Sequence, residues 1–216
     1  YRTLVTYKET WANQKIDPAA EWTDTWRDPR FASSAQGGGL PENALTGTMY
    51  VVNNSDSPVT VNNEEGKLRL WRNTSLTSLV PGTSAELAPH TVGYESNEDI
   101  DNGFRPQGLI QLSTTVAATP EYLIDHGNTV VPGVTHHHVT LYRAPSGALV
   151  FSSGSVQWSW GLEHPEDGSA VPDSRMQQAE VNLLADMGAQ PSTLMPGLVV
   201  ATASSDRTPP VTTITA

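Results

Sequence analysis

Residues 146–188 constrain the fold more than any other part of the sequence. A short apolar run at 147–151, bounded by turn residues, predicts a buried strand. A loop rich in glycine and tryptophan follows. Residues 175–187 then place methionine and leucine side chains on one face at helical spacing, with Asp173 or the following serine at the cap position and Gly188 at the end. The stretch predicts an α/β unit of strand, loop and packing helix, beside which the other strands pair.

The composition narrows the functional class. The chain has 216 residues, 37% of them hydrophobic, which is enough for a substantial core. A net charge of −11 argues against a nucleic-acid partner, and no apolar run is long enough to span a bilayer. The absence of cysteine excludes disulfides, cysteine-zinc sites and a cysteine nucleophile, and so excludes glutamine amidotransfer itself.

The middle third of the chain predicts a β-meander with short turns. Residues 48–53 and 59–61 are short strand-like runs, and residues 67–72 alternate polar and apolar side chains, which is typical of a half-exposed strand. Residues 120–126 predict a helical turn. Three consecutive histidines, 136–138, open a further predicted strand; at most two of them can face one metal site, and the alternative is an exposed strand start.

Residues 89–106 carry the densest chemistry, because several oxygen donors fall within a dozen positions. The potential ligands or partners in this stretch are His90, Tyr94, Glu95, Glu98, Asp99, Asp101, Asn102 and Arg105. Such a set could hold a hard or borderline cation. The spacing does not match the twelve-residue calcium loop, because the closing glutamate is missing. The alternative interpretation is a solvated acidic turn.

Six blocks of the sequence, in the same order, resemble a known family. They are Tyr7–Trp11, Trp26–Pro29, Pro41–Gly47, Gly93–Glu95, Asp101–Pro106 and Gly154–Leu162. The chain is similar over roughly residues 1–191 to the C-terminal region of the large (β) subunit of N,N-dimethylformamidase, and more closely to secreted actinobacterial homologues that continue into immunoglobulin-like modules. The resemblance implies an α/β fold with a class I glutamine amidotransferase-like sheet, elaborated with β-meander strands and a packing helix near 175–187.

The resemblance also implies a chemistry, the hydrolysis of a small amide C–N bond. Enzymes of the family hold a mononuclear iron through two tyrosine phenolates and one glutamate. By motif and rough spacing, Tyr7 is the candidate for one tyrosine ligand and Glu95 for the glutamate, with Tyr94 as a weaker candidate by adjacency. The other tyrosine belongs to a motif that this chain does not contain, and the small α subunit is absent. The resemblance therefore implies a fragment with an incomplete site, inactive on its own.

Each candidate has a structural alternative. Tyr7 could be a core tyrosine, and Glu95 could form a structural salt bridge with Arg105. The second class of function is a non-catalytic accessory domain of a secreted protein, which binds glycans through exposed tryptophans. The tryptophans in question are Trp11, Trp22 and Trp26.

The ends of the sequence suggest a fragment of a modular extracellular protein. The chain opens directly on an apolar alternation, and its last residues form a linker rich in proline and threonine. We expect residues 1–195 to form an N-terminally truncated dimethylformamidase β-subunit-like domain. Residues 196–216 are expected to lead toward a following immunoglobulin-like module, so that the partners are further domains of the same chain and a small amide substrate.

Overall fold

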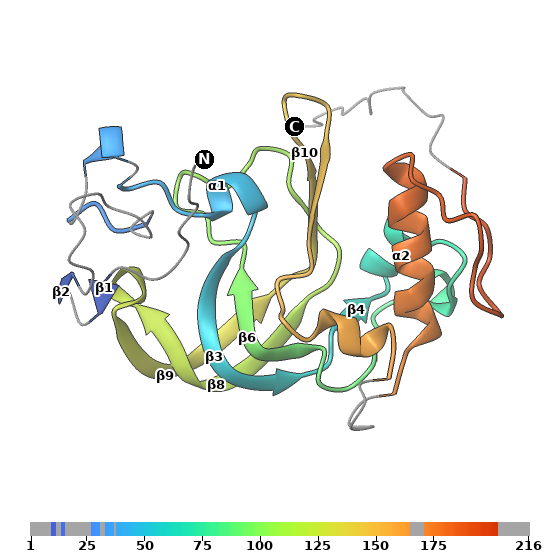
Figure 1. Cartoon of the computed structure of the whole chain (residues 1–216). Helices are drawn as coiled ribbons and strands as arrows, with labels where there is room; N and C mark the ends of the chain where they lie inside the picture. Colours follow the sequence, from blue (N-terminus) through green and yellow to red (C-terminus); the bar gives the residue numbers. More distant parts are fainter. Residues whose placement is uncertain are drawn as a thin grey trace, which may run out of the picture.

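The computed structural model describes residues 10–11, 14–15, 27–30, 33–36, 38–164 and 171–202. These residues form a mixed α and β structure in which every strand pairing is antiparallel. A curved four-stranded sheet lies at one end of the molecule and the helix α2 at the other, as Figure 1 shows. The expectation of helices and strands in one fold is confirmed. The described residues do not identify the glutamine amidotransferase-like sheet.

The four-stranded sheet has the order β6-β3-β8-β9. Its strands are β3 (Met49–Ser57), β6 (Val92–Glu98), β8 (Thr115–Ile124) and β9 (Thr129–His137). The register of β3 against β6 shifts twice, between Tyr50 and Val52 and between Val52 and Ser55. Asn54 has a left-handed backbone (φ 54°) within the second shift, a conformation that asparagine tolerates. Because of these bulges, β3 continues to Ser57. The cluster of polar residues at 54–57 would otherwise predict a turn.

The described residues also form three smaller sheets. One has three strands in the order β11-β10-β7, and the other two are two-stranded ladders. The ladder of residues 10–11 and 14–15 lies beside the four-stranded sheet, at the end of the molecule away from α2 (Figure 1). The strands and ladders are β7 (Ile110–Gln111), β10 (Thr140–Arg143), β11 (Leu149–Ser152), β4 (Thr60–Asn62) with β5 (Ser84–Glu86), and β1 (Thr10–Trp11) with β2 (Gln14–Lys15). The strand predicted at 147–151 is therefore β11. It is a half-buried edge strand rather than a buried one, because only β10 pairs with it.

The predicted helix is confirmed as α2, which spans Ser174–Asp186. The Asp173 side chain accepts a hydrogen bond from the backbone N–H of Arg175 and caps the first turn. Gly188 follows the last turn with a φ of 77°, a conformation that glycine adopts without steric cost, and it ends the helix.

One hydrophobic core joins α2 to the sheets. Met176, Ala179 and Leu183 on α2 pack into the cluster that contains Trp71 and Trp158, both buried. The other members of this cluster are Val59, Val61, Leu70, Leu76, Leu87, Ala88, Val92, Leu112 and Val139. The opposite side of α2 packs Val181 and Ala185 against the segment around Ala201. The helix is therefore buried on two sides, which fixes its position against the β structure.

The short turns correct two predictions made from the sequence. Residues 67–72 do not form a strand but 3-10 turns, η2 (Glu65–Lys67) and η3 (Arg69–Trp71). Leu70 and Trp71 are consecutive and both buried, which a half-exposed strand does not allow. Residues 120–126 belong to β8 and to the turn η5 (Asp125–Gly127), because pairing with β9 outweighs the local helical preference.

The remaining helical segments are short. They are η1 (Ser34–Gln36), α1 (Asn43–Thr46), η4 (Ser75–Ser78) and η6 (Trp158–Gly161). The turn α1 lies at the start of β3, as Figure 1 shows. In the described part of the chain, no helix combines the length and the apolar character that crossing a membrane requires.

Candidate functional site

Several of the sequence blocks singled out above meet around the start of β3 and the strand β6. The Arg27 guanidinium pairs with the Glu42 carboxylate and donates to the backbone oxygen of Tyr50 (2.7 Å). The buried Asn43 amide donates to Asn102 Oδ1 (2.9 Å) and accepts from Asn102 Nδ2 (3.2 Å). Polar side chains from blocks far apart in the sequence thus hold one another in place at this end of the sheet.

The block 154–162 covers the free edge of β6. The backbone N–H of Asn97 donates to the Gly154 oxygen (2.8 Å), and the Val156 N–H donates to the Glu95 oxygen (3.2 Å). The Ser155 hydroxyl bridges both backbone groups of Gly93. These bonds satisfy the outer edge of β6 and fix the backbone on both sides of Glu95.

Glu95 and Glu98 occupy the same strand but have different surroundings. Glu98 is 8% exposed, and its carboxylate accepts hydrogen bonds from the hydroxyls of Tyr122 (3.0 Å) and Thr135 (2.8 Å) and from the His136 N–H (2.9 Å). Glu95 is half-buried, and its carboxylate has neither a hydrogen bond nor an ion pair among residues 38–164 or the other described ranges. Glu98 is held as a structural group, whereas Glu95 is an available acceptor.

The alternative in which Glu95 pairs with Arg105 is wrong. Arg105 instead contacts the Asp99 carboxylate (3.4 Å) and the Asp101 carboxylate (3.1 Å). Both contacts lie within the loop that follows β6, so the arginine stabilises that loop and leaves the Glu95 carboxylate alone.

Tyr50 on β3 is the tyrosine that the structure adds to this environment. It pairs across the strands with Asn97, which lies two positions from Glu95 and so on the same face of β6. Burial, together with the charges of Glu95 and Glu121, raises the pKa of Tyr50 to about 12. Asn97 could have been found from the sequence, because side chains two positions apart on a strand share a face and Asn97 follows Glu95 by two. Tyr50 could not, because only the pairing of β3 with β6 places it in this environment.

The other polar residues of the stretch 89–106 disperse into separate contacts. Asp99 is buried and binds His138 Nδ1 (2.6 Å) and Gln111 Nε2 (2.9 Å), and His90 contacts Asp56 (2.7 Å). Burial is the largest single influence on the pKa of the Asp99 carboxyl and raises it. The hydrogen bonds from His138 and Gln111 act together in the other direction, and the pKa is lowered overall. In the described ranges, no three His, Cys, Asp or Glu side chains gather into a metal-binding group.

The histidine run 136–138 does not form a shared site. His136 is exposed, His138 binds Asp99, and His137 is fully buried with its Nε2 bonded to the Ser153 oxygen (2.9 Å). Burial lowers the pKa of His137 to about 4. The run closes β9 and leads into β10 instead of opening a strand.

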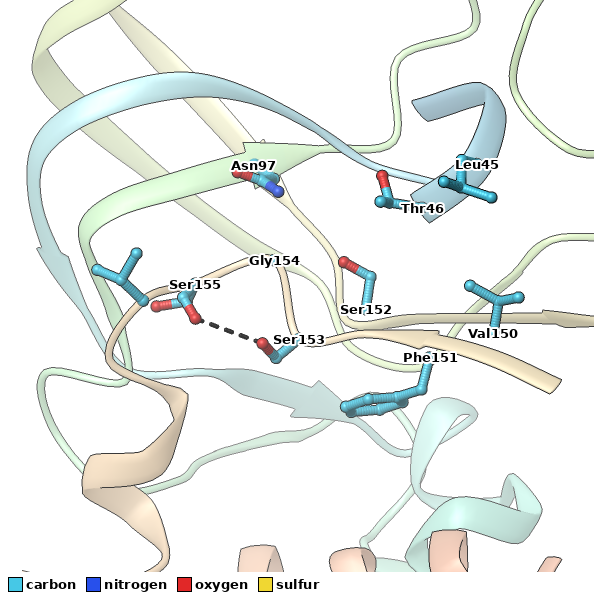
Figure 2. Close-up of a pocket in the computed structure, with 10 residues that line it drawn as sticks. Leu45, Thr46, Asn97, Val150, Phe151, Ser152, Ser153, Gly154 and Ser155 are labelled. Atoms are coloured by element: carbon cyan, nitrogen blue, oxygen red, sulfur yellow. Dashed lines mark hydrogen bonds between the residues drawn. The ribbon is translucent and has the colours of Figure 1, made fainter. Parts of the chain in front are cut away.

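A pocket of about 430 Å³ lies beside the covered edge of β6, as Figure 2 shows. Two of the sequence blocks line it: Leu45 and Thr46 from α1, and the segment 154–156. Asn97 from β6, residues 150–152 from β11 and Ser153, which follows that strand, complete the lining. Val156 lines the pocket and donates its backbone N–H to the backbone oxygen of Glu95, so the pocket lies against the β6 backbone near that residue.

Some candidates fall outside the described residues. Tyr7, Trp22 and Trp26 lie there, as does the side chain of Trp11. Of the tryptophans that the structure does describe, Trp71 and Trp158 are buried, and Trp160 is half-buried against His90 at a ring-centroid distance of 6.3 Å.

Comparison with known proteins agrees with the resemblance of the sequence blocks. A family model described as "N,N-dimethylformamidase beta subunit-like, C-terminal" matches residues 1–172. Neither the curated proteins nor the solved structures contain a match. The helix α2 follows the matched residues, although its side chains pack into the same core.

Proposed function

The chain belongs to the N,N-dimethylformamidase beta subunit-like C-terminal family, and from this membership we propose that it is the C-terminal part of an amidohydrolase. The proposed reaction adds water across the C–N bond of a small amide and releases a carboxylic acid and an amine. The reaction is metal-dependent in this proposal, with Glu95 as one protein ligand.

The Glu95 carboxylate is the observation that carries the proposal. It is half-buried and has no partner in the part of the chain that the structure describes, while a backbone frame on both sides holds it in place. A half-buried carboxylate without a partner is free to bind a cation or a substrate. Asn97, two positions along β6 from Glu95, lines a pocket that two family blocks also line.

The donor chemistry fits a hard cation such as iron(III). Carboxylate and phenolate oxygens suit such ions, and Tyr7 and Glu95 would be the ligands that this chain supplies. Tyr94 is the weaker choice, because neighbouring side chains on a strand point to opposite faces. When bound, the metal supplies Lewis acidity toward the amide carbonyl and an activated water.

The chain's own residues position the reaction. The segment 154–157 fixes Glu95 by its backbone bonds to β6, and the pocket beside it takes up the amide. We further propose that the amidotransferase-like sheet implied by the family belongs to the intact protein, with the antiparallel sheets as its β elaboration. Secretion and attachment to further domains are part of the same proposal.

Metal analysis of the intact protein tests the proposal, together with its absorption spectrum. We expect near-stoichiometric iron and a tyrosinate-to-iron charge-transfer band. The variant Glu95→Gln should lose most of the metal and the band. Glu86→Gln is the matched control, because Glu86 is an exposed glutamate on β5 and undergoes the same change of charge. Full iron content in Glu95→Gln would remove Glu95 from the site.

The accessory-domain alternative gains no specific support from the described residues. Trp71 and Trp158 lie in the core and cannot stack on a sugar. If the intact protein binds no metal and shows no band after iron reconstitution, glycan-binding assays become the next experiment.

A further inference from the structure

The pocket beside β6 has a polar floor made by three side chains from different strands and loops. Asn97 Nδ2 donates to Thr48 Oγ1 (3.2 Å), and Thr48 Oγ1 is hydrogen-bonded to Ser152 Oγ (2.6 Å). Thr48 is fully buried, so this chain of bonds has one fixed central member. Asn97 and Ser152 both line the pocket, and Figure 2 shows them on facing sides of it.

The hydrogen bond to Thr48 fixes which end of the Asn97 amide is free. Because Nδ2 is used by Thr48, Oδ1 remains as the open acceptor, and it has no partner in the described part of the chain. Either hydroxyl can donate in the bond between Thr48 and Ser152, and when Thr48 donates, the Ser152 hydroxyl hydrogen is free for a ligand. The floor therefore offers one acceptor, Asn97 Oδ1, and two donors, the Ser152 hydroxyl and the second N–H of Asn97 Nδ2.

The rim of the pocket is apolar and open. Leu45 on α1 is 74% exposed and Val156 is 53% exposed, although both are large hydrophobic side chains. Val150 extends this surface along β11. A ligand with a hydrocarbon substituent would cover these side chains, and each buried methylene would add to the binding free energy.

We infer that this pocket binds amides that retain an N–H and carry an apolar substituent, with the N–H donated to Asn97 Oδ1 and the carbonyl oxygen accepting from Ser152. The inference rests on the proposed function and narrows its substrate class. An amide whose nitrogen is fully alkylated has no N–H to donate. Binding such an amide would desolvate Asn97 Oδ1 and leave it unpaired, which disfavours this class of ligand. Primary and secondary amides larger than the formamides can form hydrogen bonds with the polar floor and cover the apolar side chains of the rim.

The test is a binding titration of the intact protein, followed by NMR chemical shifts, with butyramide and with N,N-dimethylbutyramide. These probes share the acyl chain and differ in the N–H. We expect the dissociation constant of butyramide to be lower by about fivefold to tenfold, the net effect of one hydrogen bond. Asn97→Leu should remove the preference. Leu45→Ser changes an exposed residue and should weaken both probes by a similar factor.

The outcomes separate the inference from the proposed hydrolysis. Equal affinity for the two probes, or no saturable binding of either, overturns the inference. A preference that Leu45→Ser and Asn97→Leu leave unchanged also overturns it, because the probe then binds elsewhere. Turnover of the amides is measured in parallel. Selective binding without turnover contradicts the hydrolase function, whereas turnover of both probes at equal rate and affinity contradicts the pocket assignment alone.

Discussion

Asn43 and Asn102 exchange two side-chain hydrogen bonds across 59 positions of sequence, at 2.9 and 3.2 Å. Asn43 is fully buried and also donates to the Ile100 oxygen (3.0 Å). The pair joins the turn α1 to the loop after β6, and so it connects the apolar rim of the pocket to the strand that carries Glu95. Neither asparagine caps a helix. The side-chain amides of both residues are used in these hydrogen bonds and are not free to contact a ligand.

This pair is expected to stabilise the fold. Asn43→Ala should lower the free energy of unfolding by about 1–3 kcal/mol, because it removes a buried amide and the hydrogen bonds that this amide makes to the Ile100 oxygen and the Asn102 side chain. Urea unfolding of Asn43→Ala, Asn102→Ala and the double variant measures the coupling between the two side chains. Additive effects of the two substitutions would contradict a direct interaction.

Glu95 and Glu98 should differ in their effect on stability. Glu98→Gln is expected to cost about 1–3 kcal/mol, since the carboxylate accepts three hydrogen bonds in a buried position. Glu95→Gln should stay within about 0.5 kcal/mol of the parent, because no described partner loses a bond. Chemical denaturation of the metal-free protein is the measurement. A large loss in Glu95→Gln would mean that the carboxylate has a structural role.

The ionisation of Tyr50 should report the presence of Glu95. Its pKa of about 12 results first from burial and then from the nearby carboxylates. Glu95→Gln removes one negative charge and should lower that pKa. Tyrosinate absorbance followed against pH, with Tyr50→Phe to assign the transition, measures the change.

Tyr122 serves as the internal control for this titration. Its pKa is also raised to about 12, by burial and by its hydrogen bond to Glu98. The Glu95 substitution should leave the Tyr122 transition in place. A uniform shift of both tyrosines would indicate a general change in the sheet instead of a local charge effect.

The free energy of unfolding should fall as the pH is lowered from the ordinary pKa of histidine to the pKa of His137 in the fold. Its pKa drops from the ordinary 6.5 to about 4 in the fold because burial disfavours the charged ring. The unfolded chain therefore binds the proton first. The stabilisation is complete above about pH 6.5 and is lost progressively down to pH 4, by roughly 3 kcal/mol.

Urea midpoints measured between pH 7 and pH 4.5 check this slope. His137→Gln should reduce the pH dependence, whereas His136→Gln, which changes the exposed neighbour, should retain it. An unchanged slope in His137→Gln would assign the acid sensitivity to other groups.

A side chain at Gly161 requires the buried end of Met176 to move. A Cβ at this position would overlap the Sδ and Cε atoms of Met176, which is fully buried on α2. Gly161→Ala is expected to cost about 1–3 kcal/mol through overpacking. Met176→Val should partly restore stability in the double variant, because it removes the overlapping atoms. Ser159→Ala, exposed in the same turn, is the control and should be close to neutral in thermal unfolding.

The sequence by itself determined the features that depend on local chemistry. The helix α2 follows from apolar spacing, the cap at Asp173 and the glycine at 188, all of which act within a few residues. Family membership follows in the same way, from short blocks that keep their order. The amide chemistry and the candidate ligands Tyr7 and Glu95 stay proposals carried by that membership.

Only the tertiary structure decided how the blocks meet and what each polar residue does. Residues 67–72 alternate like a strand, yet none of the described strands pairs with them, and packing of Leu70 and Trp71 into the core forms a turn instead. Glu95 and Glu98 look equivalent in the sequence. Glu98 accepts from three donors on β8 and β9, whereas Glu95 has no donor among the residues that the structure describes, because strand order and register are set by contacts between distant residues.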